Sequence, residues 1–165
     1  MVGVPLRYVP KHLSKKDENT QKKELTKSRR MYKRNKYHTR KRLPSFKNKK
    51  SSHITKAQEI YDIDKIVPSR KLSRKTKCKV KGLRAIFRKG QGAYYSSGSR
   101  PNQTPHSWGY ARLASSLTGG PASIVDFRIL NNECSQKSKA LKMAKTTLNK
   151  SRRNKSKPKV KKVSL

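Results

Sequence analysis

The chain of 165 residues has few acidic residues, few cysteines and few aromatic residues. Its 8 aspartates and glutamates are outnumbered by 45 lysines and arginines, so the formal net charge is +37. Leucine, isoleucine, valine and phenylalanine supply about 18% of the residues, below the ~20% under which a highly charged chain is expected to be disordered. Self-repulsion at this charge also opposes a compact state. The composition therefore predicts that much of the chain cannot fold alone.

The chain also lacks the apolar run of ~18 residues that crosses a bilayer, and its proline-broken start, MVGVPLRYVP, is too short for a signal peptide. We expect no transmembrane segment, and a protein that is soluble or held at a surface by charge. The two cysteines, Cys78 and Cys134, form no C-x-x-C pair and have no histidine-rich partner segment. Such isolated thiols favour plain small side chains over a disulfide, although the sequence leaves their pairing open.

One local acidic cluster is present, formed by Glu59, Asp62 and Asp64. Salt bridges to neighbouring lysines and arginines explain this cluster more simply than a metal site, because those cations surround it on both sides. We therefore expect neither a metal nor another cofactor.

The motifs that support catalysis are missing as well. Gly90-x-Gly92 is no dinucleotide fingerprint, because Tyr95 stands where the third glycine belongs, and no Lys-Ser/Thr pair follows Gly98 as in a phosphate-binding loop. The serines around Gly98 have His106 nearby in sequence, but the acidic group that orients such a base is missing locally. We expect no enzyme, no catalytic residue and no small-molecule substrate.

Charge is distributed unevenly and suggests three parts. Residues 1–52 carry a net charge of +15, residues 53–136 carry +10, and residues 137–165 carry +12. We therefore predict a basic N-terminal arm with one long helix at 1–52 and a central helical domain at 53–134. A C-terminal helix with a polybasic tail is expected at 135–165.

The stretch 90–120 is the least charged part of the chain. It holds six of the eight glycines and four of the eight tyrosine and tryptophan residues, but only two charged residues, Arg100 and Arg112. Its first part, 90–102, is expected to be a loop whose backbone N–H groups could bind an anion with Arg100. The favoured alternative is that both arginines hold the fold by bonding carbonyls or Asp126. Structural roles are expected for Tyr94, Tyr95, Trp108, Tyr110, Gly119 and Gly120.

Caps and apolar spacing predict a mainly α fold, a small irregular helical domain with a Gly/Ser/aromatic loop, flanked by extended basic arms. Residues 2–10 are expected to be extended, either flexible or added to a partner. The segment 122–130 is assigned to a helix, with a strand as the competing assignment because β-branched residues are enriched. The other helices are expected at 15–35 after Ser14, at 52–61, from Ser69 through Leu72, at 80–89 ending before Gly90, at 105–117 after Thr104, and at 135–149 with Ser135 as cap.

Basic residues are densest between Lys27 and Arg42, where nine occur in sixteen positions. Tyr32 and Tyr37 lie among them, and these rings either stack on bases or pack on a neighbour. The tail sequence KPKVKK resembles a classical nuclear-import signal. Contacts with a polyanion or an acidic partner are expected from Arg29, Arg30, Arg34, Arg40, Lys41, Arg42, Arg100, Arg112, Arg152, Arg153, Lys159, Lys161 and Lys162.

The central stretch KGQGAYYSSGSRPNQTPHSWGYARLASSLTGG carries a resemblance to a known group of proteins. Together with the preceding YDIDKIVPSRKLSRKT and the following ASIVDFRIL, it resembles an uncharacterised domain family encoded by large DNA viruses of algae and amoebae, the chlorella viruses among them. The similarity runs from about Pro10 to Lys145. It implies a viral origin and no known catalytic activity, and it brings no functional residues with it.

Two functions are consistent with these features. The first is a small structural protein of a large DNA virus particle, a minor capsid protein whose partners are other virion proteins of the capsid shell. The second is a DNA-binding, genome-condensing virion protein whose lysine-rich contacts are independent of sequence. A ribosomal-type RNA binder ranks third. Either virion role places the protein in the virion, and in the host nucleus or cytoplasm during assembly.

Overall fold

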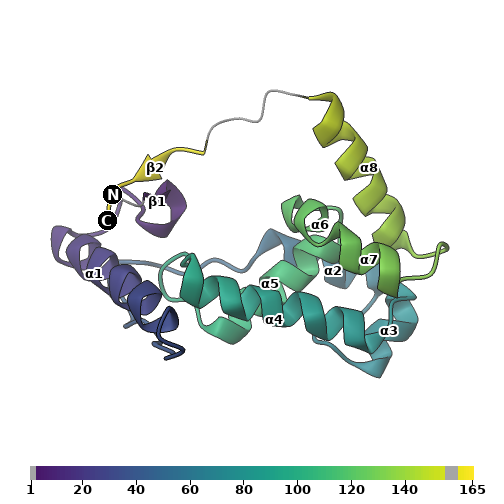
Figure 1. The fold of residues 1–165 in the computed structure, drawn as a ribbon, viewed down its shortest axis with the longest axis horizontal. Helices are drawn as coiled ribbons and strands as arrows, with labels where there is room; N and C mark the ends of the chain where they lie inside the picture. Colours follow the sequence, from purple (N-terminus) through teal and green to yellow (C-terminus); the bar gives the residue numbers. More distant parts are fainter. Residues whose placement is uncertain (1–2, 155–159) are drawn as a thin grey trace. The chain divides into compact units, whose positions relative to one another are not determined.

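The computed structural model describes residues 3–154 and 160–165, and these form a mainly α protein, as expected from the sequence (Figure 1). Within this part of the chain, eight α-helices are accompanied by one two-stranded sheet. The elements are β1 (Val4–Pro5), the 3₁₀ helix η1 (Leu6–Tyr8), α1 (Lys15–Tyr32), α2 (Ser52–Tyr61), α3 (Arg70–Thr76), α4 (Val80–Ser96), α5 (Pro105–Leu117), α6 (Pro121–Val125), α7 (Phe127–Glu133), α8 (Lys139–Arg153) and β2 (Lys162–Val163).

Segments that lie far apart in the sequence gather into two compact units. The first unit contains the described residues within 1–49, 91–108 and 158–165, and the second contains those within 50–90 and 109–157. Helices α4 and α5 contribute residues to both units. These boundaries differ from the division at residues 52 and 134 that the charge distribution suggested, because packing and not charge decides which segments come together.

The first unit has its own apolar core, so its N-terminal residues are packed and not an extended arm, although the one long helix expected within 1–52 is present as α1. Six buried side chains build this core, and Phe46, Trp108 and Leu165 pack against it. Strands β1 and β2 are antiparallel, with Val4 opposite Val163. The N-terminal segment is therefore fixed by its own chain. The six core residues are Val4, Tyr8, Val9, Leu13, Leu25 and Leu43.

Helix α1 begins as the sequence predicts and ends three residues earlier. The hydroxyl of Ser14 accepts a hydrogen bond from the Asp17 N–H at 3.2 Å, which satisfies one of the free donors of the first turn. The helix ends at Tyr32, and Asn35 then takes a left-handed conformation with φ of 56°. Asparagine adopts this conformation more readily than most residues, so it reverses the chain here.

The second unit encloses a larger core between its helices. Its centre includes Tyr61, Leu83, Leu113 and Leu141, all buried. Helix α2 has the bounds that the sequence predicts, and α3 extends beyond Leu72 to Thr76. The segment 122–130 is helical and not a strand, but it is broken at Asp126 into α6 and α7.

Two further expectations about helix ends are corrected. Helix α4 continues through Gly90 to Ser96, so the segment 90–96 is helical and not the start of a loop. Helix α8 begins at Lys139 with Ser138 as its cap, and not at Ser135, because the Ser138 hydroxyl accepts the Leu141 N–H at 3.4 Å. By contrast, Thr104 caps α5 as expected, and its hydroxyl accepts the Ser107 N–H at 3.0 Å.

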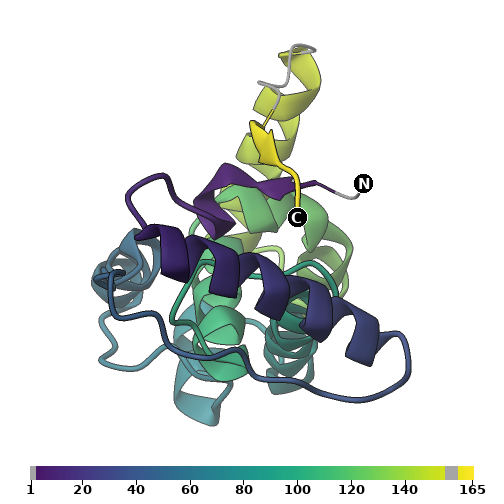
Figure 2. The same ribbon diagram turned by 90° about the vertical axis from the view of Figure 1, so that its left-hand side faces the viewer.

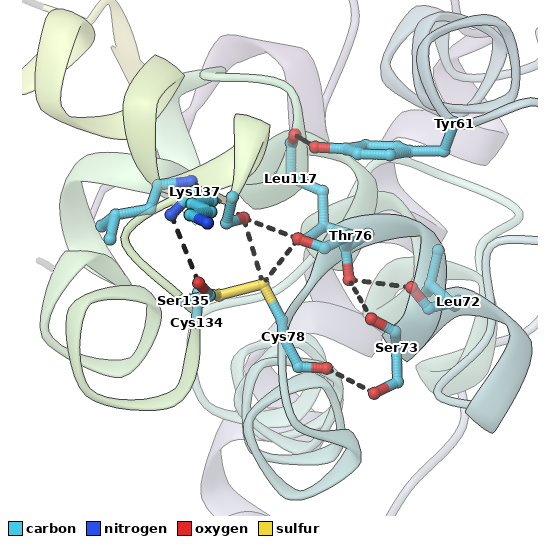
Figure 3. Close-up of a disulfide and its surroundings, with 11 residues drawn as sticks. Tyr61, Leu72, Ser73, Thr76, Cys78, Leu117, Cys134, Ser135 and Lys137 are labelled. Carbon is cyan, nitrogen blue, oxygen red and sulfur yellow. Dashed lines mark hydrogen bonds between the residues drawn. A yellow bond between two sulfur atoms is a disulfide. The ribbon is translucent and has the colours of Figure 1, made fainter.

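Cys78 and Cys134 form a disulfide, which corrects the expectation of two unpaired thiols (Figure 3). Their backbones are joined by an antiparallel bridge, in which the Lys79 N–H donates to the Glu133 carbonyl at 2.8 Å and the Ser135 N–H donates to the Lys77 carbonyl at 2.9 Å. The two Cα atoms lie 3.9 Å apart. The backbone bridge between segments 56 residues apart therefore places the two sulfurs together, and no local sequence motif predicts this pairing.

None of the described helices combines the length and the apolar character that a membrane span requires. The described residues also contain no group of three histidine, cysteine or acidic side chains placed to hold a metal ion.

Candidate polyanion-binding surface

Helix α1 turns an unusually polar side toward the rest of its unit. Among its buried residues are Asp17 and Glu24, two of the three carboxylates of residues 1–49. Asp17 accepts hydrogen bonds from the Ser45 N–H at 2.9 Å and from the Ser45 hydroxyl at 2.6 Å. Glu24 accepts from the Lys41 N–H at 3.1 Å and bonds the His38 ring at 2.8 Å. The two carboxylates thereby fix the segment 38–45 along the helix.

Figure 2 shows this segment running back along α1 after the turn at the end of the helix. Because Asp17 and Glu24 bind backbone, hydroxyl and histidine groups of the segment, they form no ion pair with its lysine and arginine side chains. Helix α1, the turn after it and the returning segment all carry basic side chains that are exposed and have no described ion-pair partner. These are Lys16, Lys23, Lys27, Arg30, Lys33, Arg34, Lys36, Lys41, Arg42 and Lys47.

A groove of about 390 Å³ lies between the first half of α1 and residues 41–45. Its cations are Lys16, Lys41 and Arg42, and its lining also includes Ser14, Asp17, Thr20 and Ser45. The hydrogen bonds from Ser45 hold the pKa of Asp17 below its usual value, so this carboxylate stays ionised and bound to Ser45 at neutral pH. Three cations around one open groove suit phosphate oxygens, which accept charge-assisted hydrogen bonds. We call Lys16, Lys41 and Arg42 the groove cations.

The carboxylate of Glu24 is also ionised. Its burial would raise its pKa, but the hydrogen bonds from His38 and from the Lys41 N–H outweigh burial, and the pKa of Glu24 is lowered.

Arg29 and Arg40, which the sequence assigns to polyanion contacts, are engaged within the fold. The guanidinium of Arg40 lies 3.7 Å from the centre of the Tyr94 ring and donates to the Tyr94 carbonyl at 2.9 Å and to the Ser99 hydroxyl at 2.6 Å. Arg29 donates to the Ser96 carbonyl at 3.2 Å. Both cations therefore satisfy carbonyls at the C-terminal end of α4, where the helix dipole favours positive charge.

Arg112 is engaged in the second unit. Its guanidinium binds Asp126 through two bonds of 2.9 and 2.8 Å, and Lys89 and Ser116 bind the same carboxylate at 2.8 and 2.9 Å. Burial would raise the pKa of Asp126, but the bonds from Arg112 and Lys89 outweigh it and the pKa is lowered. Arg112 therefore binds Asp126 within the fold, as the favoured alternative from the sequence proposed.

The remaining predicted cations are placed at the surface, apart from Lys159, which lies outside the described residues. Arg100 is exposed after α4, and Arg152 and Arg153 are exposed at the end of α8. Lys161 and Lys162 are exposed at β2, although the Lys161 carbonyl accepts the Leu6 N–H at 2.9 Å. The structure therefore does not gather all predicted cations into one site.

The residues expected to be structural divide by burial. Tyr94 is fully buried, and its hydroxyl accepts the Arg40 N–H at 3.0 Å. Trp108 is only partly buried and meets Tyr8 edge-to-face at 5.9 Å, so it borders the first core and does not form its centre. Tyr110 stacks on Phe87 at 4.8 Å. At the turn after α5, Gly119 has a φ of 68°, and a Cβ on Gly120 would lie 2.5 Å from the Ser115 hydroxyl.

The sequence does not reveal the hydrogen bonds by which Asp17 and Glu24 hold the segment 38–45, or the groove beside them. Asp17 and Glu24 are seven residues apart, which is a same-face spacing on a helix, but nothing in the sequence marks Ser45 or the Lys41 N–H as their partners.

These features define a mainly helical, strongly basic protein with a groove lined by three exposed cations. The chain belongs to the protein family DUF5824, a family of unknown function, whose model matches residues 5–128. A search of curated proteins finds no match to the chain, and neither does a search of solved structures.

Proposed function

We propose that this chain is a non-enzymatic, strongly basic structural protein of a large DNA virus particle, a minor capsid protein that bridges acidic partners inside the shell. The observation that carries the proposal is the use of carboxylates in the first unit. Asp17 and Glu24 are engaged within the fold and Glu18 pairs with Lys22 at 2.7 Å, so the dense cations of residues 15–47 await an external counter-charge.

The imbalance holds for the described part of the chain as a whole. Only six of its lysine and arginine side chains lie within 4 Å of a carboxylate. Surface ion pairs add little stability, so the fold itself does not need the other cations for pairing. A function for them outside the chain is the simplest account of their number. The particle as the setting is taken from the resemblance inferred from the sequence alone, since the matched family is one of unknown function.

The second candidate is a virion protein that binds and condenses DNA without reading its sequence. The excess of lysine over arginine favours this candidate, because base reading relies on arginine. Neutralising eight phosphates would give a salt slope, d log K/d log [salt], of about −7. Tight duplex binding with a slope of this size supports the second candidate.

One fractionation experiment separates the two candidates. Purified particles are divided into shell and nucleoid, and the protein is quantified in each and in empty shells. A minor capsid protein is expected in full and empty shells at the same fixed stoichiometry. Recovery that depends on the genome refutes the capsid role and supports DNA binding, and absence of the protein from purified particles refutes both.

The groove is tested with two triple variants of equal net charge. Changing the groove cations, Lys16, Lys41 and Arg42, to glutamine is expected to reduce the salt slope of polyanion binding by about 3, one unit for each contact. The control changes Lys71, Lys79 and Arg84 to glutamine, because these are also exposed and have no described ion-pair partner. Equal losses in both variants would mean that net charge, and not the groove, binds the polyanion.

A further inference from the structure

Three tyrosine rings form a cluster at the end of α1. Tyr32 stacks on Tyr95 with ring centres 6.0 Å apart and planes 8° from parallel, and Tyr37 lies 5.0 Å from Tyr95 and 6.1 Å from Tyr32. Tyr37 is 69% exposed, the largest exposed fraction among the large apolar and aromatic side chains described. We call Tyr32, Tyr37 and Tyr95 the tyrosine cluster.

The backbone on both sides of the cluster fixes the position of the exposed Tyr37 ring. After α1 ends, the Lys36 N–H donates to the Met31 carbonyl at 3.0 Å, and the left-handed Asn35 returns the chain so that Tyr37 meets Tyr32. Tyr95 belongs to the last turn of α4, which Arg29 and Arg40 hold through carbonyl bonds. The ring on which Tyr37 leans is therefore fixed before any ligand arrives.

The sequence neighbourhood of the cluster is cationic and contains no acidic residue. Arg30, Lys33, Arg34 and Lys36 are exposed and form no described ion pair. No aspartate or glutamate occurs between Glu24 and Glu59, or within 91–108. An exposed aromatic ring in a stretch of exposed cations complements a ligand that has both flat apolar rings and a chain of negative charges.

We infer that the tyrosine cluster is a stacking site for the unpaired bases of a single-stranded nucleic acid, with the surrounding lysines and arginines on its phosphates. Base–aromatic stacking adds affinity for any sequence, because every base has a π face. A duplex keeps its base faces inside the stack, and an acidic peptide without aromatic rings offers only charge. This site goes beyond the proposed function, which requires charge alone.

The test compares strands that differ only in their bases. Fluorescence anisotropy is measured with a labelled 12-mer of deoxythymidine, with an abasic 12-mer that has the same phosphates, and with a 12-base-pair duplex, at fixed salt. The intact strand is expected to bind at least about fivefold tighter than the abasic strand. Equal affinity for the intact and abasic strands overturns the inference while leaving charge-based binding intact. Binding to none of the three probes counts against both stacking and the DNA-binding candidate.

Variants assign the preference to the cluster. Tyr37→Ala is expected to bring the intact strand to within about twofold of the abasic strand, whereas Tyr37→Phe keeps the ring and the preference. Arg34→Gln weakens binding of both strands by the same factor, because it removes charge and no ring. Val125→Ala, at a residue 65% exposed in the second unit, leaves the preference unchanged. A preference that survives Tyr37→Ala in a variant with unchanged circular dichroism refutes the assignment.

Discussion

Replacing Gly90 with alanine should destabilise the second unit, because α4 and α5 touch there through glycine. A Cβ on Gly90 would lie 2.7 Å from the Gly109 Cα and 3.1 Å from the Arg112 Cβ. Carbon atoms in contact are normally about 3.5–4.0 Å apart. The obstacle at Gly109 is backbone, so the helices have to separate by close to an ångström, and overpacking of this kind costs about 1–3 kcal/mol.

A second effect opposes the clash and has to be subtracted. Alanine is favoured over glycine in a helix interior by about 1 kcal/mol. Because the obstacle at Gly109 is backbone, the clash belongs to the upper part of that range, about 2–3 kcal/mol, and the net loss expected for Gly90→Ala is about 1–2 kcal/mol of unfolding free energy. For a chain of this size that lowers the melting temperature by roughly 2–8 °C.

Gly92 provides a matched control on the same helix. A Cβ there would meet only the Tyr32 hydroxyl at 3.5 Å, which is an ordinary contact. Gly92→Ala therefore keeps the gain in helix propensity without a clash and is expected to stabilise by up to about 1 kcal/mol. Thermal and urea unfolding, followed by circular dichroism, measure both variants. The reasoning fails if Gly90→Ala is as stable as Gly92→Ala.

Two further changes test the interior of the second unit. Asp126→Asn should cost about 3 kcal/mol, the lower end for a broken buried ion pair, because Lys89 is half-exposed and can turn to water. Because folding lowers the pKa of Asp126, its contribution to the free energy of unfolding is complete above the unfolded pKa of about 3.9 and is lost as pH falls through the folded pKa. Acid titration should therefore destabilise the wild type below about pH 4 more than the variant. Cys134→Ser should lower the free energy of unfolding by roughly 4 kcal/mol, because the disulfide closes a loop of 56 residues in the unfolded chain. It should also abolish the effect of a reductant on the melting temperature. A reductant that leaves the wild type unchanged would contradict the disulfide.

Local signals in the sequence were sufficient for the beginnings of helices. Ser14 and Thr104 are caps whose hydrogen bonds reach only three residues along the chain, so the residues that decide them are adjacent in sequence. Helix α2 also has the predicted bounds, although its N-cap residue Ser51 makes no side-chain capping hydrogen bond. The fold class could therefore be predicted, because it depends on the sum of such local choices.

Glycine shows where local reasoning fails. Gly90 resembles the residue that ends a helix in the left-handed conformation, but the structure keeps it helical because Gly109 of another helix needs the space of its missing side chain. The sequence contains both glycines, but it does not indicate that they meet. Cys78 and Cys134 are a similar case, because a backbone bridge between distant segments pairs them.

The candidate site was predictable in its charge and not in its geometry. Within the basic run 27–42, Arg40 and Arg34 are equivalent by composition, yet Arg40 covers the Tyr94 ring and binds carbonyls whereas Arg34 is exposed. The difference is set by Ser28 and Ser99, whose hydroxyls accept from the Arg40 guanidinium at 3.1 and 2.6 Å. A count of cations therefore overestimates the number available to a ligand and misses where they lie.

The low apolar content led to an expectation of disorder that the structure does not support, and the reason also explains the exposed charge. Asp17 and Glu24 replace apolar contacts on the inner side of α1 with hydrogen bonds to the segment 38–45. Hydrogen bonds to an ionised carboxylate are stronger than bonds between neutral groups, so these contacts replace part of the missing apolar burial. With Asp17 and Glu24 engaged in these bonds, no lysine or arginine of residues 33–47 has a carboxylate of the described residues within 4 Å, so the interactions that fold the first unit also leave the returning segment cationic.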